Sequence, residues 1–91
     1  MSAWRLKFAP KAVKQLAKLD KPTTALILAW LEKNIDGCAN PRQRGKALVV
    51  NLAGSWRYRI GDYRVLCELR DTELVVLAVE IAHRREAYKK K

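Results

Sequence analysis

Three arginines are spaced so that they share one face of a predicted β-hairpin. Arg57 and Arg59 precede the dipeptide Gly61-Asp62, and Arg64 follows it. Gly-Asp is typical of two-residue hairpin turns, so Arg59 is expected directly opposite Arg64. Like charges placed opposite each other destabilise a sheet by about 1 kcal/mol or less, and a bound anion would turn that repulsion into attraction. Because guanidinium donates in pairs, the pattern predicts a phosphate site. The alternative is that the side chains splay apart into water.

The C-terminal residues supply groups that can move protons. His83 is the only histidine of the chain, and Tyr88 follows it closely. Both side chains donate and accept protons, and tyrosine also stacks on exposed bases. The alternative for His83 is an ordinary surface histidine at the end of a strand, and Tyr88 could merely pack. The same tail carries Arg84, and together with the three arginines these residues resemble a site. The candidate catalytic residues are Arg57, Arg59, Arg64, His83, Arg84 and Tyr88.

Further basic residues surround this set. No acidic residue occurs between Asp36 and Asp62, whereas five basic residues do. An acid-free basic stretch is typical of surfaces that contact a nucleic-acid backbone. The residues predicted to bind RNA without taking part in chemistry are Arg42, Arg44, Lys46 and Arg85.

The sequence lacks the patterns that other phosphate chemistries need. It has no Gly-rich P-loop, one histidine and only two distant cysteines, Cys38 and Cys67. These cannot form a zinc site, and no carboxylate cluster is suited to magnesium. A nuclease of this composition is expected to need neither metal nor cofactor. RNA suits such an enzyme because its own 2′-hydroxyl attacks the adjacent phosphate, so the protein need only align groups, move protons and stabilise charge.

Composition bounds the class of protein. The 91 residues contain 19 Lys and Arg against 9 Asp and Glu, a net charge of +10. A chain of this length is expected to form one domain, residues 1–91, with any site in a surface groove. The charge favours a polyanionic partner over an uncharged one. Neither a secretory signal nor a membrane-spanning run is recognisable, and cysteines are few, so a cytoplasmic location without membrane contact is expected.

The elements that must position these residues follow from periodicity. The alternation from Trp4 to Phe8 predicts a short strand. Pro10 and Pro22 each permit a helix to begin, so a helical hairpin is expected. Its apolar stripes are Val13, Leu16 and Ala17 in the first helix and Leu26, Ile27, Trp30 and Leu31 in the second. Three strands are predicted at 55–60, 63–70 and 73–82, followed by a short basic tail. The expected fold is α+β in the order β-α-α-β-β-β, with the N-terminal strand and the helical hairpin packed on one face of an antiparallel sheet.

The second hairpin is less well defined by the sequence than the first. A two-residue turn at Asp71-Thr72 would place Arg64 opposite Val79 and turn Glu80 toward the core. Either the last strand is buried on both faces or the turn has another length, because a shift of one residue exchanges every side chain between the faces.

The motifs resemble those of the RelE type within the RelE/ParE toxin superfamily. The likeness is carried by Gly45-Lys46-Ala47-Leu48, by the stretch from Leu52 to Val65 with its Trp-Arg-Tyr-Arg and Gly-Asp-Tyr-Arg elements, and by His83-Arg84-Arg85 with Tyr88. It spans essentially the whole chain, helical hairpin included. The family's two basic strand positions fall on Arg57 and Arg59.

The resemblance implies a function. RelE-type toxins of type II toxin–antitoxin systems enter the ribosomal A site and cut mRNA, leaving a 2′,3′-cyclic phosphate and a 5′-hydroxyl, and an acidic antitoxin neutralises them. The expected activity is therefore an endoribonuclease that inhibits translation. Well-studied members have lysines where this chain has Arg57 and Arg59. Arginine effectively cannot lose its proton, so His83 is the predicted base and Tyr88 a predicted acid or stacking residue.

Three other functions fit the same charge and fold. The first is a ParE-type toxin, which inhibits DNA gyrase. The second is a nucleic-acid-binding module without catalytic activity, and the third is a protein whose only role is to bind an acidic partner. The arginines with Tyr88 favour the RelE type.

Overall fold

Two helices begin where the prolines allow them to begin. The computed structural model describes residues 3–48 and 55–83, and it contains α1 (Pro10–Lys18) and α2 (Lys21–Asn34). Proline occupies the first turn of each helix, where its missing N–H costs no hydrogen bond. Asp20 caps α2: its carboxylate accepts from the Thr23 backbone N–H at 3.2 Å and from the Thr23 hydroxyl at 2.8 Å. These hydrogen bonds lower the pKa of Asp20.

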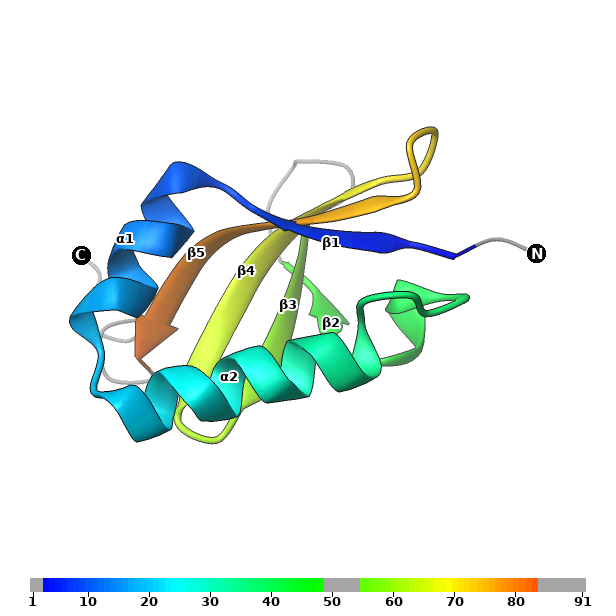
Figure 1. Ribbon diagram of the computed structural model, residues 1–91. Coiled ribbons are helices and arrows are strands. Elements are labelled where there is room, and N and C mark those ends of the chain that lie inside the picture. Colours follow the sequence, from blue (N-terminus) through cyan, green and yellow to red (C-terminus); the bar gives the residue numbers. More distant parts are fainter. Residues whose placement is uncertain (1–2, 49–54, 84–91) are drawn as a thin grey trace.

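The sheet has five strands in the order β1-β5-β4-β3-β2 (Figure 1). Their bounds are β1 (Arg5–Phe8), β2 (Lys46–Ala47), β3 (Ser55–Ile60), β4 (Tyr63–Arg70) and β5 (Val75–His83). The α+β class is confirmed. Two details of the prediction are wrong: the N-terminal strand is an edge of the sheet, parallel to β5, and the residues 46–47 form a short strand rather than loop. The sheet is therefore mixed.

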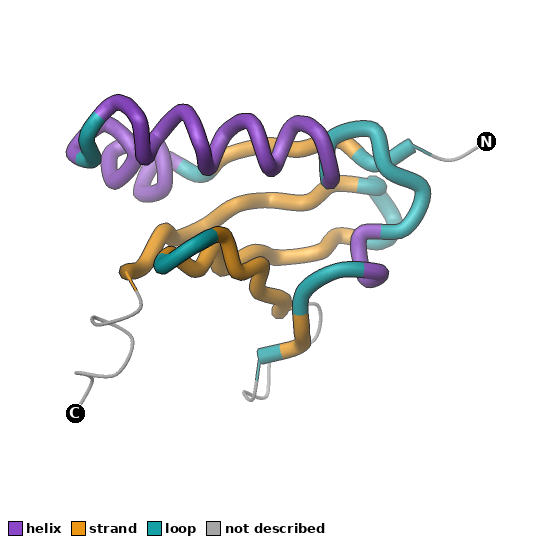
Figure 2. The backbone as a smooth tube through the Cα atoms, turned by 90° about the horizontal axis from the view of Figure 1, so that it is seen from below, coloured by secondary structure: helices purple, strands orange, loops and turns teal. Residues whose placement is uncertain are grey.

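Both helices lie on the same side of the sheet, and the opposite side carries no helix among the described residues (Figure 2). The core between them contains Ile27, Leu31, Tyr58 and Val65, all fully buried. The two apolar stripes are only partly confirmed, because Val13 is 52% exposed and Leu26 is 57% exposed. One large apolar side chain of each helix therefore faces solvent, while Leu16 and Ile27 in the same stripes are buried.

The first hairpin has the predicted register. Ile60 pairs with Tyr63 and Arg59 pairs with Arg64, across the turn at Gly61 and Asp62. Tyr58 and Val65 consequently face the helices, and the arginines face away from them.

The second hairpin differs from the prediction in turn length and in register. Its turn is four residues long, 71–74, so that Arg70 pairs with Val75. A β-bulge then leaves Val79 without a partner between the pairs Cys67–Ala78 and Leu66–Glu80. The extra residue turns Ile81 toward the core and Glu80 toward the opposite face. The bulge thus resolves the burial conflict that a two-residue turn would create.

Candidate functional site

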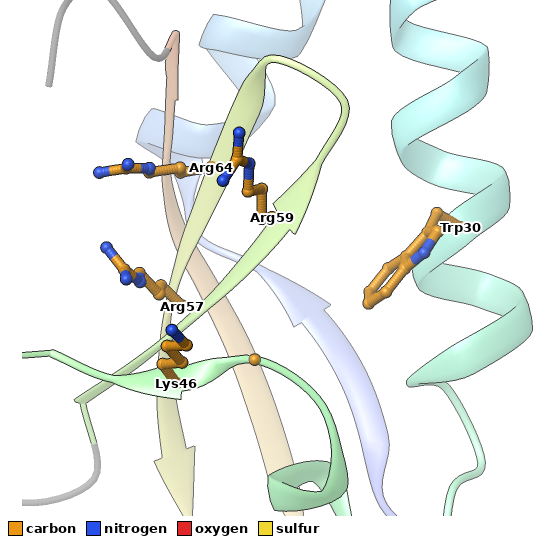
Figure 3. A pocket seen from close by; sticks show the side chains of 6 residues that line it. Trp30, Lys46, Arg57, Arg59 and Arg64 are labelled. Carbon is orange, nitrogen blue, oxygen red and sulfur yellow. The ribbon is translucent and has the colours of Figure 1, made fainter.

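The predicted arginine cluster forms on the side of the sheet that carries no described helix. Arg57 and Arg59 project from β3 and Arg64 projects from β4, while Lys46 of β2 pairs with Arg57 (Figure 3). We call these four side chains the arginine face. With Gly45 and Trp30 they line a surface groove of about 230 Å³. The groove therefore concentrates four positive charges from three neighbouring strands.

Carboxylates are placed away from two of these arginines. Within residues 3–48 and 55–83, none lies within ion-pair distance of Arg57 or Arg59. Glu68 instead pairs with Arg70 at 2.8 Å, and Glu80 pairs with Lys11 at 3.3 Å. The repulsion between the opposed Arg59 and Arg64 is the kind that an anion relieves. The arrangement is suited to binding a phosphate.

A loop holds Lys46 against this face. Residues 41–47, which we call the strap, begin with the 3₁₀ turn Pro41–Gln43 and end with β2. The Tyr58 hydroxyl donates to the Pro41 carbonyl at 2.7 Å, and the Trp56 indole N–H donates to the Arg44 carbonyl at 2.7 Å. Both donors belong to β3, the strand that carries Arg57 and Arg59. The strap and the arginine face are thus positioned by the same strand.

Arg42 has a different environment from the one predicted. Its guanidinium donates two hydrogen bonds to the Asp71 carboxylate, at 2.9 and 3.0 Å, and lies 5.9 Å from the centre of the Trp56 ring. These hydrogen bonds lower the pKa of Asp71. The pair joins the strap to the turn between β4 and β5, so Arg42 acts first as a structural link. Arg44 and Lys46 are exposed.

His83 does not lie with the arginines. It pairs with Tyr63 across β4 and β5, two residues beyond the pair Val65–Ile81, and therefore faces the helix side. Its ring meets the Tyr63 ring edge-on, with centroids 4.9 Å apart, and it lines a groove with Gln15 of α1. The structure therefore separates the predicted base from the predicted phosphate site by the thickness of the sheet. Arg84, Arg85 and Tyr88 lie outside the described residues.

Cysteine and metal chemistry find little support in the described part of the chain. Burial raises the pKa of the Cys67 thiol to about 12, and it also raises the pKa of Cys38, so neither is an activated nucleophile. Residues 3–48 and 55–83 contain no group of three or more His, Cys, Asp or Glu that could hold a metal ion. They also contain no helix long and apolar enough to cross a membrane.

The sequence matches the model of a known protein family. The model of the ParE toxin of the type II toxin–antitoxin system matches residues 6–88. The chain belongs to this toxin family. No curated protein matches the sequence.

Solved structures place the toxin in the RelE/ParE superfamily. It is similar to a chain of the RelBE2 toxin–antitoxin complex of Mycobacterium tuberculosis, at 27% identity and a TM-score of 0.80, over 92% of this chain and 94% of that one. A chain of the archaeal RelE–RelB complex of Pyrococcus horikoshii is 25% identical, with a TM-score of 0.65 and coverage of 91% and 97%. A variant of the E. coli toxin RelE in the free state shares the fold at 20% identity, with a TM-score of 0.74 over 97% and 90%.

Two residues of the toxin's groove were not predicted from the sequence. Trp30 was assigned to the core stripe of α2, yet it is half-buried and lines the groove. Gly45 adopts a φ of 79° and packs tightly against β3. Helical spacing correctly predicts that Trp30 lies on the inner side of α2. It does not indicate that the ring lies near the part of β3 that has no partner in β2. For Gly45, which directly precedes β2 within the strap, the residue type itself is the only signal that the sequence offers.

Tyr58 tests how firmly the strap is held. We expect Tyr58→Phe to lower the free energy of unfolding by about 1 to 2 kcal/mol, because the buried Pro41 carbonyl loses its donor while the ring still fills its place. Burial raises the pKa of Tyr58, so its hydroxyl remains a donor at neutral pH. Urea denaturation measures the change. Thr72→Ala, which removes an exposed hydroxyl in the turn between β4 and β5, serves as the control and should leave the unfolding free energy nearly unchanged. An unchanged unfolding free energy for Tyr58→Phe would show that the hydrogen bond contributes nothing.

Proposed function

We propose that this toxin is a metal-independent endoribonuclease that cleaves mRNA in the ribosomal A site and so inhibits translation. The observation that supports the proposal is the opposed pair Arg59–Arg64 on an open face, with Arg57 and Lys46 beside it. Four cations from three strands match a phosphate that gains negative charge during cleavage. The likeness to RelE toxins supports the same activity.

In the proposed reaction the 2′-oxygen of a ribose attacks the adjacent phosphorus, and the bond to the 5′-oxygen breaks. The 2′-hydroxyl gives up its proton and the leaving 5′-oxygen takes one, so the products are a 2′,3′-cyclic phosphate and a 5′-hydroxyl. Arg59 and Arg64 are proposed to hold the phosphate oxygens, with Arg57 at the side. Their N–H donors stabilise the additional negative charge of the transition state. That charge develops between two guanidinium groups that repel each other in its absence.

The proton transfers cannot be assigned to these arginines, because guanidinium keeps its proton. His83 faces the helix side, so the proposal no longer assigns it the role of base. Arg84 and Tyr88, which the family resemblance also implicates, keep their proposed roles in charge stabilisation and in proton transfer or stacking. Arg44 and Lys46, with Arg85, are proposed to contact the RNA backbone around the cut.

We also propose that the partner that controls the toxin is a cognate acidic antitoxin. Two of the similar chains come from toxin–antitoxin complexes. The net charge of +10 gives an acidic partner a strong electrostatic complement.

A second candidate function is inhibition of DNA gyrase. It is favoured by the family model, which describes the ParE toxin. A gyrase inhibitor needs the fold and the charge but has no requirement for opposed arginines around a phosphate.

Primer extension on mRNA held in translating ribosomes tests the proposal directly. We expect purified toxin to produce a new stop within the A-site codon, and to leave the supercoiling activity of purified gyrase unchanged. A supercoiling defect with no new stop would replace the proposed ribonuclease with the gyrase inhibitor. If the toxin caused neither a new stop nor a supercoiling defect, both candidate functions would be rejected and its target would be a different one.

A further inference from the structure

The groove beside the arginine face follows an open edge of the sheet. Strand β2 pairs only with Arg57 and Trp56, so β3 continues for three residues beyond its neighbour. Leu48 donates its backbone N–H to the Ser55 carbonyl at 3.3 Å, which shows that Ser55 directs its backbone groups toward β2. Backbone direction alternates along a strand, so Arg59 directs its N–H and C=O to the same edge. Within the described residues, that edge has no strand beyond Arg57.

A tryptophan stands on the other side of this edge. Trp30 projects from α2 toward β3 (Figure 3), and its ring lies tilted against that of Tyr58, with centroids 5.7 Å apart. Its half-buried side chain lines the same groove as Arg57, Arg59 and Arg64. The groove thus has an aromatic wall on the helix side and cations on the outer side. The backbone N–H and C=O of Arg59, with which no strand among the described residues pairs on this edge, belong to the stretch of β3 between the two.

We propose that this groove binds one nucleobase of a single-stranded nucleic acid, stacked on Trp30, while the attached phosphate is held by the arginines. The proposal rests on the proposed function for the identity of the ligand, but it does not require cleavage. Each part of a nucleotide meets matching chemistry: the phosphate meets guanidinium, the base plane meets indole, and the base edge meets the N–H and C=O of Arg59.

Two features of the groove favour a base over a purely structural tryptophan. Trp30 packs against the buried core, yet its side chain is only half-buried and lines a groove of about 230 Å³ together with the arginines. The unpaired edge of β3 also places hydrogen-bonding backbone groups beside that ring, where a planar ligand can use both. Because every base has a π-face, stacking of this kind predicts tolerance of base identity.

Equilibrium binding of short 2′-O-methyl RNA tests the inference, because that RNA lacks the attacking hydroxyl and stays intact. Fluorescence anisotropy would compare an intact oligonucleotide with a set that carries one abasic residue at each position in turn. For the wild-type toxin, we expect one abasic position to weaken binding by roughly tenfold, the size of one base stack. If no abasic position weakened binding to the wild-type toxin, that result alone would overturn the proposal, and no variant would be needed.

The variants identify the stacking side chain. Trp30→Leu is expected to weaken binding of the intact oligonucleotide by the same factor and to abolish the effect of the abasic residue, whereas Trp30→Phe keeps most of both. Leu26→Ala, at an exposed position of the same helix, should change neither. If Trp30→Leu lost affinity equally for intact and abasic RNA, or lost none, Trp30 would not be the stacking residue.

The outcome is independent of the test of catalysis. Abasic-sensitive binding through Trp30 without A-site cleavage would retain the nucleobase site and reject the ribonuclease. Cleavage without such binding would reject the nucleobase site alone.

Discussion

Arg64→Ala is expected to reduce the rate of A-site cleavage by roughly a hundredfold or more, the size of the loss when one preorganised donor to a developing charge is removed. Arg64 faces Arg59 across the hairpin, so the two guanidinium groups share one phosphate in the proposed reaction. Binding of uncleaved RNA should weaken far less, with a loss of about one unit in the slope of log affinity against log salt. Single-turnover cleavage on ribosomes and equilibrium binding measure the two effects separately.

Lys7→Ala provides a matched control for Arg64→Ala. Lys7 lies on β1, at the far edge of the sheet, and it also directs its side chain away from the helices. The change removes one positive charge from the same side of the molecule without touching the groove. A comparable loss of rate in Lys7→Ala would mean that total charge matters and position does not. Equal losses of rate and affinity in Arg64→Ala would reduce Arg64 to a binding residue.

Gly45→Ala is expected to lower the free energy of unfolding by about 3 kcal/mol or more, through overpacking and a strained backbone together. A Cβ at this position would collide with the Arg57 carbonyl oxygen and lie 2.8 Å from the Trp56 indole nitrogen. The φ of 79° is also one that side chains with a Cβ rarely adopt. Because the first obstacle is backbone, the strap must move away from β3. Lys46 would move with it, so RNA binding should weaken as well.

Gly37→Ala separates the two contributions. Gly37 has a φ of 81°, close to that of Gly45, but a Cβ there meets no atom within 4 Å. Only the backbone strain remains, and the expected loss is about 1 kcal/mol. Urea denaturation of both variants measures the difference. Equal losses in the two would mean that the close approach of the strap to β3 has no energetic weight.

The sequence predicted what local chemistry determines. Gly61-Asp62 specifies a short turn, and the register of the first hairpin follows from it residue by residue. The helices begin at Pro10 and just before Pro22, as the prolines indicate. The second hairpin was wrong because its four-residue turn and its bulge have no comparable local signal. The bulge at Val79 lets Ile81 be buried, and the Ile81 backbone N–H donates to Gln15 of α1, so the bulge depends on contacts between distant parts of the chain.

The same reasoning explains which parts of the site could be predicted. Arg57, Arg59 and Arg64 belong to the first hairpin, so their common face was correct. His83 belongs to the last strand beyond the bulge, where one extra residue decides which side of the sheet it faces. The helical stripe predicts the same position for Trp30 whether its ring is covered by the core or lines a groove. The groove exists beside it because β2 is short and leaves part of β3 without a neighbour, which the sequence does not indicate.

The parallel pairing of β1 with β5 also orders events during synthesis of the toxin. β1 is the first strand to leave the ribosome, yet its partners, from Val75 to Ala78, lie near the other end of the chain. The helical hairpin and the arginine hairpin depend on neighbouring residues, so they can form while translation continues. The sheet itself is complete only when β5 has emerged. Strand β1 therefore lacks its partner in the sheet until the residues from Val75 to Ala78 have been synthesised and have left the ribosome.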